Sequence, residues 1–124
     1  EGVGLICRTP LCFGFLSGAY DGVTPFDAQD HRSRWPVAQR VRWAEGARRI
    51  SDTLPASQGS PAQLALRFCL SYPGVSTAIP GMLTVAQVEE DAAASDLGAR
   101  DEGTRRAAEA VYHEEAFFLR PAAI

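Results

Sequence analysis

Two short apolar runs in the sequence each lead into a turn whose backbone could bind an anion. Residues Gly2–Cys7 form the first run, and Val75–Ile79 form the second, which ends at Pro80-Gly81. The second turn leads directly into Thr84-Val85-Ala86-Gln87, in which Thr and Gln have the spacing of a capping box at a helix start. The first N–H groups of a helix lack intrahelical acceptors and lie at the positive end of its dipole. The sequence therefore predicts an anion site beside these turns.

The two runs predict strands, and the rest of the sequence predicts the helices that hold them in place. Both runs are apolar without alternation, which is typical of strands buried on both faces of a parallel sheet. Residues 9–20 are expected to form an ordered loop packed by its own apolar side chains, and residues 21–34 a polar loop without secondary structure that is either functional or mobile. Capping and amphipathic patterns predict helices over residues 36–54, 60–70, 84–96 and 101–119. This alternation indicates an α/β fold with parallel strands.

Three blocks of the sequence resemble, in order, parts of the aldo-keto reductases. Residues 2–20, which begin GVGLICRTPL, resemble the seventh strand and following loop of that family. Residues 60–70 (SPAQLALRFCL) resemble its seventh helix, and residues 75–91, which begin VSTAIPG, resemble its eighth strand and the helix at the adenine end of the cofactor. The resemblance covers residues 2–97. It implies that residues 1–124 form one partial domain, the C-terminal part of a TIM-type (β/α)8 barrel with two parallel strands and flanking helices.

The resemblance also implies a function, namely reduction of a small carbonyl substrate with a nicotinamide dinucleotide, NADP or NAD. The residues that it places along the pyrophosphate are Thr9, Pro10, Leu11, Gly14 and Leu16. Those that it places around the adenosine are Gly81, Met82, Leu83, Gln87, Glu90 and Asp91. Arg8 joins these candidates, because it stands where many members have an aromatic side chain against the nicotinamide.

Two positions depart from the family pattern in a way that leaves the choice of cofactor open. Leu83 stands where a basic residue often meets the 2′-phosphate of NADP, and Asp91 stands where Asn is usual. Both changes remove favourable contacts with an anion. NADP, NAD and the loss of cofactor binding therefore all remain open.

The chain does not contain the Asp, Tyr, Lys and His tetrad that the resemblance requires for catalysis. It has no Lys at all, so no amine is present to lower the pKa of a catalytic Tyr. We therefore assign no catalytic residue. One interpretation is a C-terminal half completed by a missing N-terminal half. The other is a non-redox half-barrel that pairs with a second copy and binds a small molecule, with an activity such as cyclisation or dehydration.

Composition excludes several other classes of function. A net charge of −3 over 124 residues argues against a nucleic-acid partner, and no apolar run approaches the roughly 20 residues that cross a membrane. Three cysteines without CxxC spacing favour reduced thiols and a cytoplasmic location. We predict no metal site, because His113-Glu114-Glu115 is followed by Phe117 where the HExxH pattern needs its second His.

Two further segments have alternative interpretations. Residues 31–35 (HRSRW) either clamp an acidic substrate or close over the cofactor, or they form a solvated loop pinned by Trp35. The apolar cluster Phe117-Phe118-Leu119 either covers a barrel mouth or packs against a second subunit.

Overall fold

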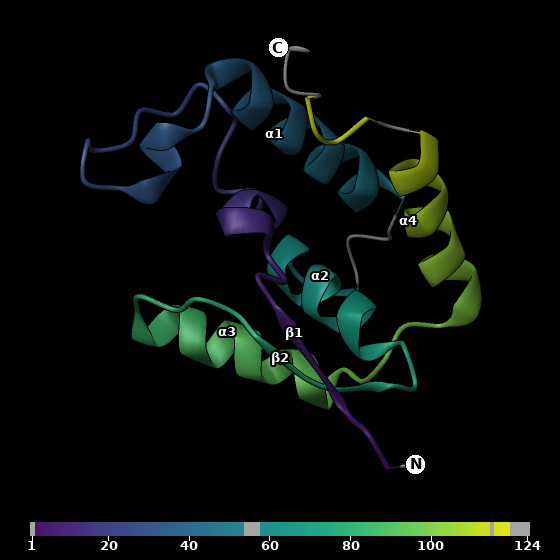
Figure 1. Ribbon diagram of the computed structural model, residues 1–124. Coiled ribbons are helices and arrows are strands. Elements are labelled where there is room, and N and C mark those ends of the chain that lie inside the picture. Colours follow the sequence, from purple (N-terminus) through teal and green to yellow (C-terminus); the bar gives the residue numbers. More distant parts are fainter. Residues whose placement is uncertain (1, 54–57, 115, 120–124) are drawn as a thin grey trace.

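The computed structural model describes residues 2–53, 58–114 and 116–119, and it has an α/β architecture (Figure 1). Its elements, in chain order, are β1 (Leu5–Arg8), the 3₁₀ helices η1 (Cys12–Ser17) and η2 (His31–Arg34), α1 (Val37–Asp52), α2 (Pro61–Leu70), β2 (Val75–Ile79), α3 (Val85–Asp96) and α4 (Glu102–Glu114). The described residues contain one sheet, in which β1 and β2 pair in parallel. The predicted parallel pair is therefore confirmed.

Side-chain caps explain where two of the helices begin. At the start of α2, the Ser60 hydroxyl accepts a hydrogen bond from the Gln63 N–H at 3.2 Å, and the Gln63 side chain accepts from the Ser60 N–H at 3.0 Å. At the start of α3, the Thr84 hydroxyl accepts from the Gln87 N–H at 3.2 Å. The capping pattern thus predicted both helix starts correctly.

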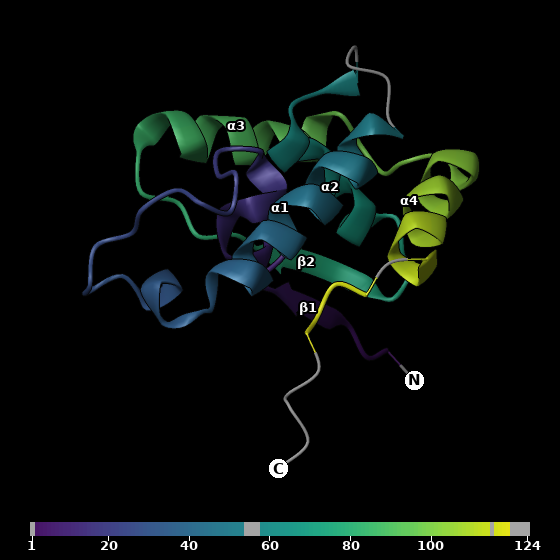
Figure 2. The ribbon, with the colours of Figure 1, turned by 90° about the horizontal axis from the view of Figure 1, so that it is seen from above.

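Helix α2 is the centre of the fold. It contacts β2, η1 and α3, and Figure 1 shows it in the middle of the molecule, with α1 above it and α3 below. Its Ala62 and Leu66 form a buried cluster with Leu11 from the β1 turn and Ala94 from α3. The same helix therefore packs against the segments that follow both strands. Figure 2, seen from above, shows α4 at the edge of this assembly.

A cluster of aromatic rings fixes the long connection between β1 and α1. Phe15 of η1 is fully buried, and its ring lies 5.6 Å from that of Trp43 in α1. Trp35 packs against the rings of Phe13 and Trp43, as expected for a residue that pins the loop. Ring pairs of this kind stabilise by about 0.5–1.5 kcal/mol beyond their buried area. Apolar side chains pack the segment after β1, as predicted, although it forms the 3₁₀ helix η1 and also packs against Trp43 of α1.

The polar segment 21–34 contains the 3₁₀ helix η2, which corrects the expectation of a loop without secondary structure. The Arg32 guanidinium forms a forked pair with the Asp30 carboxylate, with its Nη2 at 2.5 Å. It also lies over the rings of Tyr20 and Phe26, at 4.7 and 4.6 Å. Arg32 is therefore engaged within the chain, and the geometry favours the pinned loop over a substrate clamp.

The strands are not buried on both faces, which corrects the prediction from their apolar composition. Leu5 and Ile6 are 57% and 65% exposed, and Ile79 on β2 is also exposed. A sheet of two strands leaves a face and two edges uncovered, so apolar composition alone does not bury it.

The C-terminal helix is shorter than the predicted range of 101–119. Helix α4 ends at Glu114, and residues 116–119 are not helical. Instead, the buried Gln39 side chain of α1 donates to the Phe117 carbonyl and accepts from the Leu119 N–H, both at 2.7 Å. The Phe118 ring also packs against Trp43. The apolar cluster Phe117-Phe118-Leu119 therefore contacts α1 of the same chain. Neither a cover over a barrel mouth nor packing against a second subunit describes this contact.

Candidate functional site

The parallel register brings the two predicted turns to one edge of the sheet. Arg8, the last residue of β1, is paired with Ile79, the last residue of β2. The carboxyl ends of the two strands therefore coincide, and residues 9–11 and 80–83 leave the sheet beside each other (Figure 1). Ligands of parallel α/β sheets bind outside the carboxyl ends of the strands, so this edge is the candidate site.

The turn after β1 contains three non-glycine residues with positive φ, a strained conformation that packing around the turn must stabilise. Thr9, Cys12 and Phe13 have φ values of 56°, 47° and 57°, in the left-handed region that favours glycine, and Gly14 follows at 94°. Non-glycine residues in this region cost of order 1–3 kcal/mol each, and they cluster at ligand sites. Pro10 and Leu11 are buried, so their packing holds the turn in place.

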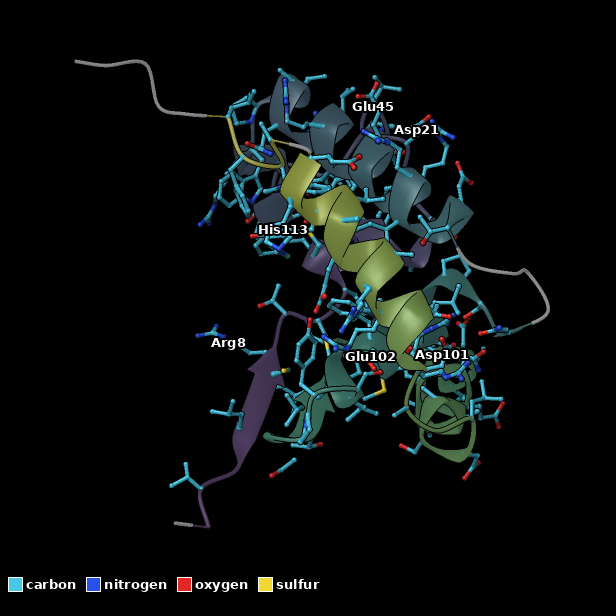
Figure 3. All side chains as sticks on the ribbon, turned by 90° about the vertical axis from the view of Figure 1, so that its right-hand side faces the viewer. Arg8, Asp21, Glu45, Asp101, Glu102 and His113 are labelled. Carbon is cyan, nitrogen blue, oxygen red and sulfur yellow. The ribbon has the colours of Figure 1, made fainter. Side chains whose placement is uncertain are left out.

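Arg8 brings positive charge to the same edge. It ends β1 and is exposed, and Figure 3 shows its side chain extending away from the strand. A guanidinium in this position is available to an anionic ligand, because no described side chain is paired with it.

The start of α3 forms the second half of the site. The Gln87 side-chain oxygen accepts from the Leu83 N–H at 2.6 Å, so part of the Gln87 amide is used to order the turn. Gly81 has an ordinary φ, and a Cβ placed on it would meet no atom within 4 Å. Gly81 thus faces open space, as expected of a position that a ligand approaches closely. Leu83 is 87% exposed and offers no charge.

Asp91 differs from the other expected adenosine residues because it is buried. It is 8% exposed and lines a groove of about 290 Å3 between β2 and α3, together with Met82 and Pro80. Desolvation, followed by the neighbouring charge of Glu90, raises the pKa of its carboxyl group. The structure thus brings Met82 and Asp91 together, whereas Gly81, Leu83 and Gln87 lie exposed at the helix start.

One positioning residue was not predicted as such from the sequence. Besides capping α2, the Gln63 side chain donates to the Glu90 carbonyl at 2.9 Å. This bond ties the centre of the fold to α3, and therefore to the second half of the site. The capping-box pattern identified Gln63 as a cap. Its bond to Glu90 joins residues 27 positions apart, and no local pattern in the sequence predicts such a contact.

Comparison with known proteins identifies the family. The model of the aldo/keto reductase family matches residues 1–111, a wider range than the resemblance alone covered, and the chain belongs to this family. It is 28% identical over 121 residues to the aldo-keto reductase yakc [NADP(+)] of Schizosaccharomyces pombe, covering 95% of this chain and 36% of that protein. It is also 33% identical over 105 residues to a probable voltage-gated potassium channel subunit beta of Arabidopsis thaliana, covering 78% of this chain and 31% of that protein.

The chain therefore spans about a third of the length of these curated relatives. A second probable potassium channel subunit beta, from Oryza sativa, is 33% identical over 104 residues, which is again 31% of its length. The two strands are consistent with part of the family's barrel. None of the described helices is long and apolar enough to span a bilayer, and the cytoplasmic location stays a prediction.

Proposed function

We propose that this chain is the cofactor-binding C-terminal portion of an NAD(P)-dependent aldo-keto reductase that reduces a small carbonyl substrate. The observation that carries the proposal is the register of β1 and β2, in which Arg8 pairs with Ile79 and both ligand-binding turns share one edge. Membership of the family and the NADP(+) in the name of one relative support the same conclusion.

The described residues fit a nicotinamide dinucleotide at both ends of the site. Thr9, Pro10, Leu11, Gly14 and Leu16 would follow the diphosphate, where Arg8 adds a cation. Gly81 leaves room for the close approach of a ligand, and Met82 and Asp91 line the groove that would receive the adenosine. The bound cofactor would supply the hydride. These residues would hold and orient it, since an extended anion binds best to fixed donors at helix starts and turns.

Leu83 and Asp91 favour a nucleotide without the 2′-phosphate. Leu83 stands where a basic residue of the family often meets the 2′-phosphate, and its exposed side chain carries no positive charge. Asp91 adds an acidic group, which would repel the 2′-phosphate. We therefore expect NADH to bind at least as tightly as NADPH, although both nucleotides remain candidates.

The proton donor of the reaction would come from outside these 124 residues. The chain has no Lys, and the Tyr72 hydroxyl is already hydrogen-bonded to the Glu109 carboxylate. The missing two thirds of the barrel would supply the catalytic groups, either from an upstream part of the same chain or from another chain.

A second candidate function is a non-redox half-barrel that binds a small molecule as a homo-oligomer, with cyclase- or dehydratase-like chemistry. The exposed apolar side chains of Leu5, Ile6 and Ile79 favour it, because a second copy could cover this open part of the sheet.

Titration of the purified protein with NADH and NADPH, followed by the fluorescence of the reduced nicotinamide, tests the proposal. Saturable binding of either nucleotide supports the reductase portion, and no binding of either contradicts it. Intact mass and light scattering on the same sample distinguish the partners. A mass well above 13.3 kDa indicates an upstream half, whereas a 13.3 kDa chain that forms dimers indicates the half-barrel.

A further inference from the structure

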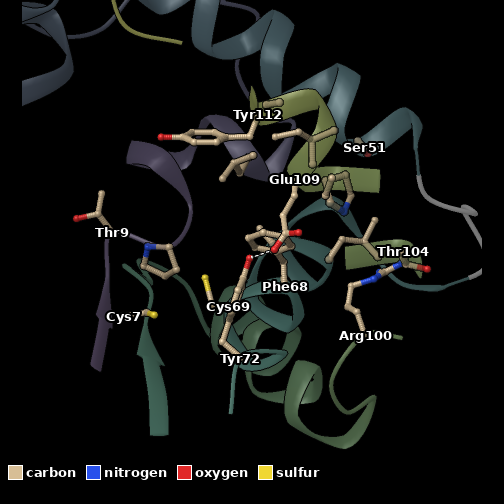
Figure 4. A pocket seen from close by; sticks show the side chains of 18 of the residues that line it. Cys7, Thr9, Ser51, Phe68, Cys69, Tyr72, Arg100, Thr104, Glu109 and Tyr112 are labelled. Atoms are coloured by element: carbon tan, nitrogen blue, oxygen red, sulfur yellow. Dashed lines mark hydrogen bonds between the residues drawn. The ribbon is translucent and has the colours of Figure 1, made fainter. Parts of the chain in front are cut away.

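Two of the three cysteines of the chain line the same cavity. This cavity of about 760 Å3 lies between α1, α2, α4 and the end of β1 (Figure 4). Cys7 of β1 and Cys69 of α2 both belong to its wall, whereas Cys12 does not. Figure 4 shows the side chains of Cys7 and Cys69 next to each other on one side of the cavity. Both thiols are free and half-buried, so a reagent that enters the cavity can reach them.

The strand register turns Cys7 toward α2. Cys7 is paired with Ala78 of β2, and the side chains of directly paired residues lie on the same face of a sheet. Ala78 packs against the buried cluster that includes Ala62 and Leu66 of α2. Cys7 is half-buried, while the other three residues of β1 are exposed. It is therefore the residue of β1 that faces the helix.

Helical spacing places Cys69 on the face of α2 that meets the sheet. Ala62, Ala65, Leu66 and Cys69 stand at positions i, i+3, i+4 and i+7, which share one face of a helix. The first three of them belong to the buried cluster or pack against it. Cys69 continues this face by one turn, so the two cysteines lie on facing surfaces of β1 and α2.

The two thiol groups are close enough to affect each other's protonation. Burial raises the pKa of the Cys69 thiol to about 11, and the charge of an ionised Cys7 and a hydrogen bond with Cys7 add to this rise. Burial alone raises the pKa of the Cys12 thiol, also to about 11. Cys7 and Cys69 are therefore neighbours, whereas neither of them contributes to the pKa of Cys12.

We propose that Cys7 and Cys69 form a reversible disulfide on the wall of this cavity, so that the pair is a redox modification site that links β1 to α2. The S–S bond requires the sulfur atoms to approach closer than hydrogen-bond contact. Strand β1 can supply this movement, because among the described residues it pairs with β2 alone. The thiols are free in this structure, which is the reduced form.

The oxidant would be a low-molecular-weight disulfide such as oxidised glutathione. The Cys7 thiolate attacks one sulfur of this disulfide, its S–S bond breaks, and one glutathione leaves and takes up a proton. Cys69 then loses its proton and displaces the second glutathione, which closes the protein disulfide. Two protein thiols are oxidised and one glutathione disulfide is reduced to two thiols. Cys69 acts second, because a thiol with a raised pKa carries little thiolate at neutral pH.

Incubation of the intact protein with oxidised glutathione, followed by an acid quench and mass spectrometry, tests the proposal. The expected product is monomeric, has lost two hydrogen atoms, about 2 Da, and regains its original mass in dithiothreitol. Trypsin cleaves after Arg and leaves each cysteine on a separate peptide, so the disulfide should join the peptide that ends at Arg8 to residues 68–100. Because the link closes a loop over residues 7–69, oxidation should also raise Tm by on the order of 10 °C.

Two serine variants sharpen this test. Cys12→Ser is the matched control, because the pKa of the Cys12 thiol is also raised to about 11 but Cys12 lies outside the cavity wall. It should keep both the link and the rise in Tm. Cys69→Ser should lose both and should retain a mixed disulfide between Cys7 and glutathione, because the second thiol is missing.

A protein that keeps all of its thiols, a link that includes Cys12, or a link between two copies overturns the proposal. A glutathione adduct that persists at Cys7 in the wild type does the same, because it shows that Cys69 does not reach it. These outcomes are measured on the wild-type protein, so they remain decisive if a variant does not fold. The proposal does not rest on nucleotide binding, and NADH titration measures that function separately.

Discussion

Replacing two glycines, one on each side of the candidate site, separates the role of the fold from the role of the ligand. Gly14 follows β1 and has a φ of 94°, and a Cβ on it would lie 2.8 Å from Cε2 of Tyr20. Gly81 follows β2, has an ordinary φ and faces open space. Gly14→Ala should therefore lower the stability of the folded protein. Gly81→Ala should leave that stability unchanged and weaken only nucleotide binding.

The magnitudes follow from this geometry. A side chain in the left-handed region costs about 1–2 kcal/mol, and the contact with Tyr20 adds about 1 kcal/mol, because that ring is packed against Phe15 and Phe26. Gly14→Ala should lower the free energy of unfolding by about 2–3 kcal/mol, which is roughly 8–12 °C in Tm for a chain of this length. Gly81→Ala should change it by less than about 0.5 kcal/mol, yet weaken nucleotide binding about 10-fold.

Urea unfolding, followed by the fluorescence of Trp35 and Trp43, measures the stability of both variants, and nucleotide titration measures affinity. A Gly14→Ala protein as stable as the wild type would refute the strained-turn argument. A Gly81→Ala protein of normal stability and normal nucleotide affinity would show that no ligand approaches this turn.

Three other predictions concern single residues. Gln39→Ala should lower the free energy of unfolding in urea by about 1–3 kcal/mol, because it removes both bonds that hold residues 117–119 on α1. Asp91→Asn should stabilise the chain at neutral pH. The raised pKa of Asp91 means that its charged form is disfavoured in the folded state, so the gain should shrink as the pH falls and the wild-type carboxyl takes up a proton, and unfolding curves at several pH values would show it. Burial raises the pKa of the Cys12 and Cys69 thiols to about 11, so both should react with iodoacetamide at pH 8 much more slowly than free cysteine does; equal rates would contradict their burial.

Local chemistry explains what the sequence predicted well. The Ser60 and Thr84 caps depend on residues three positions apart, and both form as expected. The parallel pairing followed from the alternation of strands and helices. These features require only short-range spacing and the physical preference of polar side chains for free helix N–H groups.

Features that depend on the rest of the molecule were not predictable in the same way. The runs at Leu5–Arg8 and Val75–Ile79 have the composition of buried strands, but burial depends on neighbouring strands, and the described part of the chain adds none to this pair. Residues 117–119 contact Gln39 of α1, which lies 78 residues before Phe117 and donates a hydrogen bond to its carbonyl oxygen, so this contact leaves no local signal in the sequence. Asp91 departs from the family pattern, in which Asn is usual at this position, and its burial became visible only in three dimensions.

The proposed function requires that the turns after β1 and β2 together hold the diphosphate of a nicotinamide dinucleotide. Backbone amide chemical shifts of the ¹⁵N-labelled protein, recorded during titration with NADH, test it most directly. We expect saturable shifts in both turns, at Thr9–Gly14 and at Gly81–Leu83, with a single dissociation constant. Shifts confined to one turn, shifts elsewhere in the chain, or no response at all would contradict it.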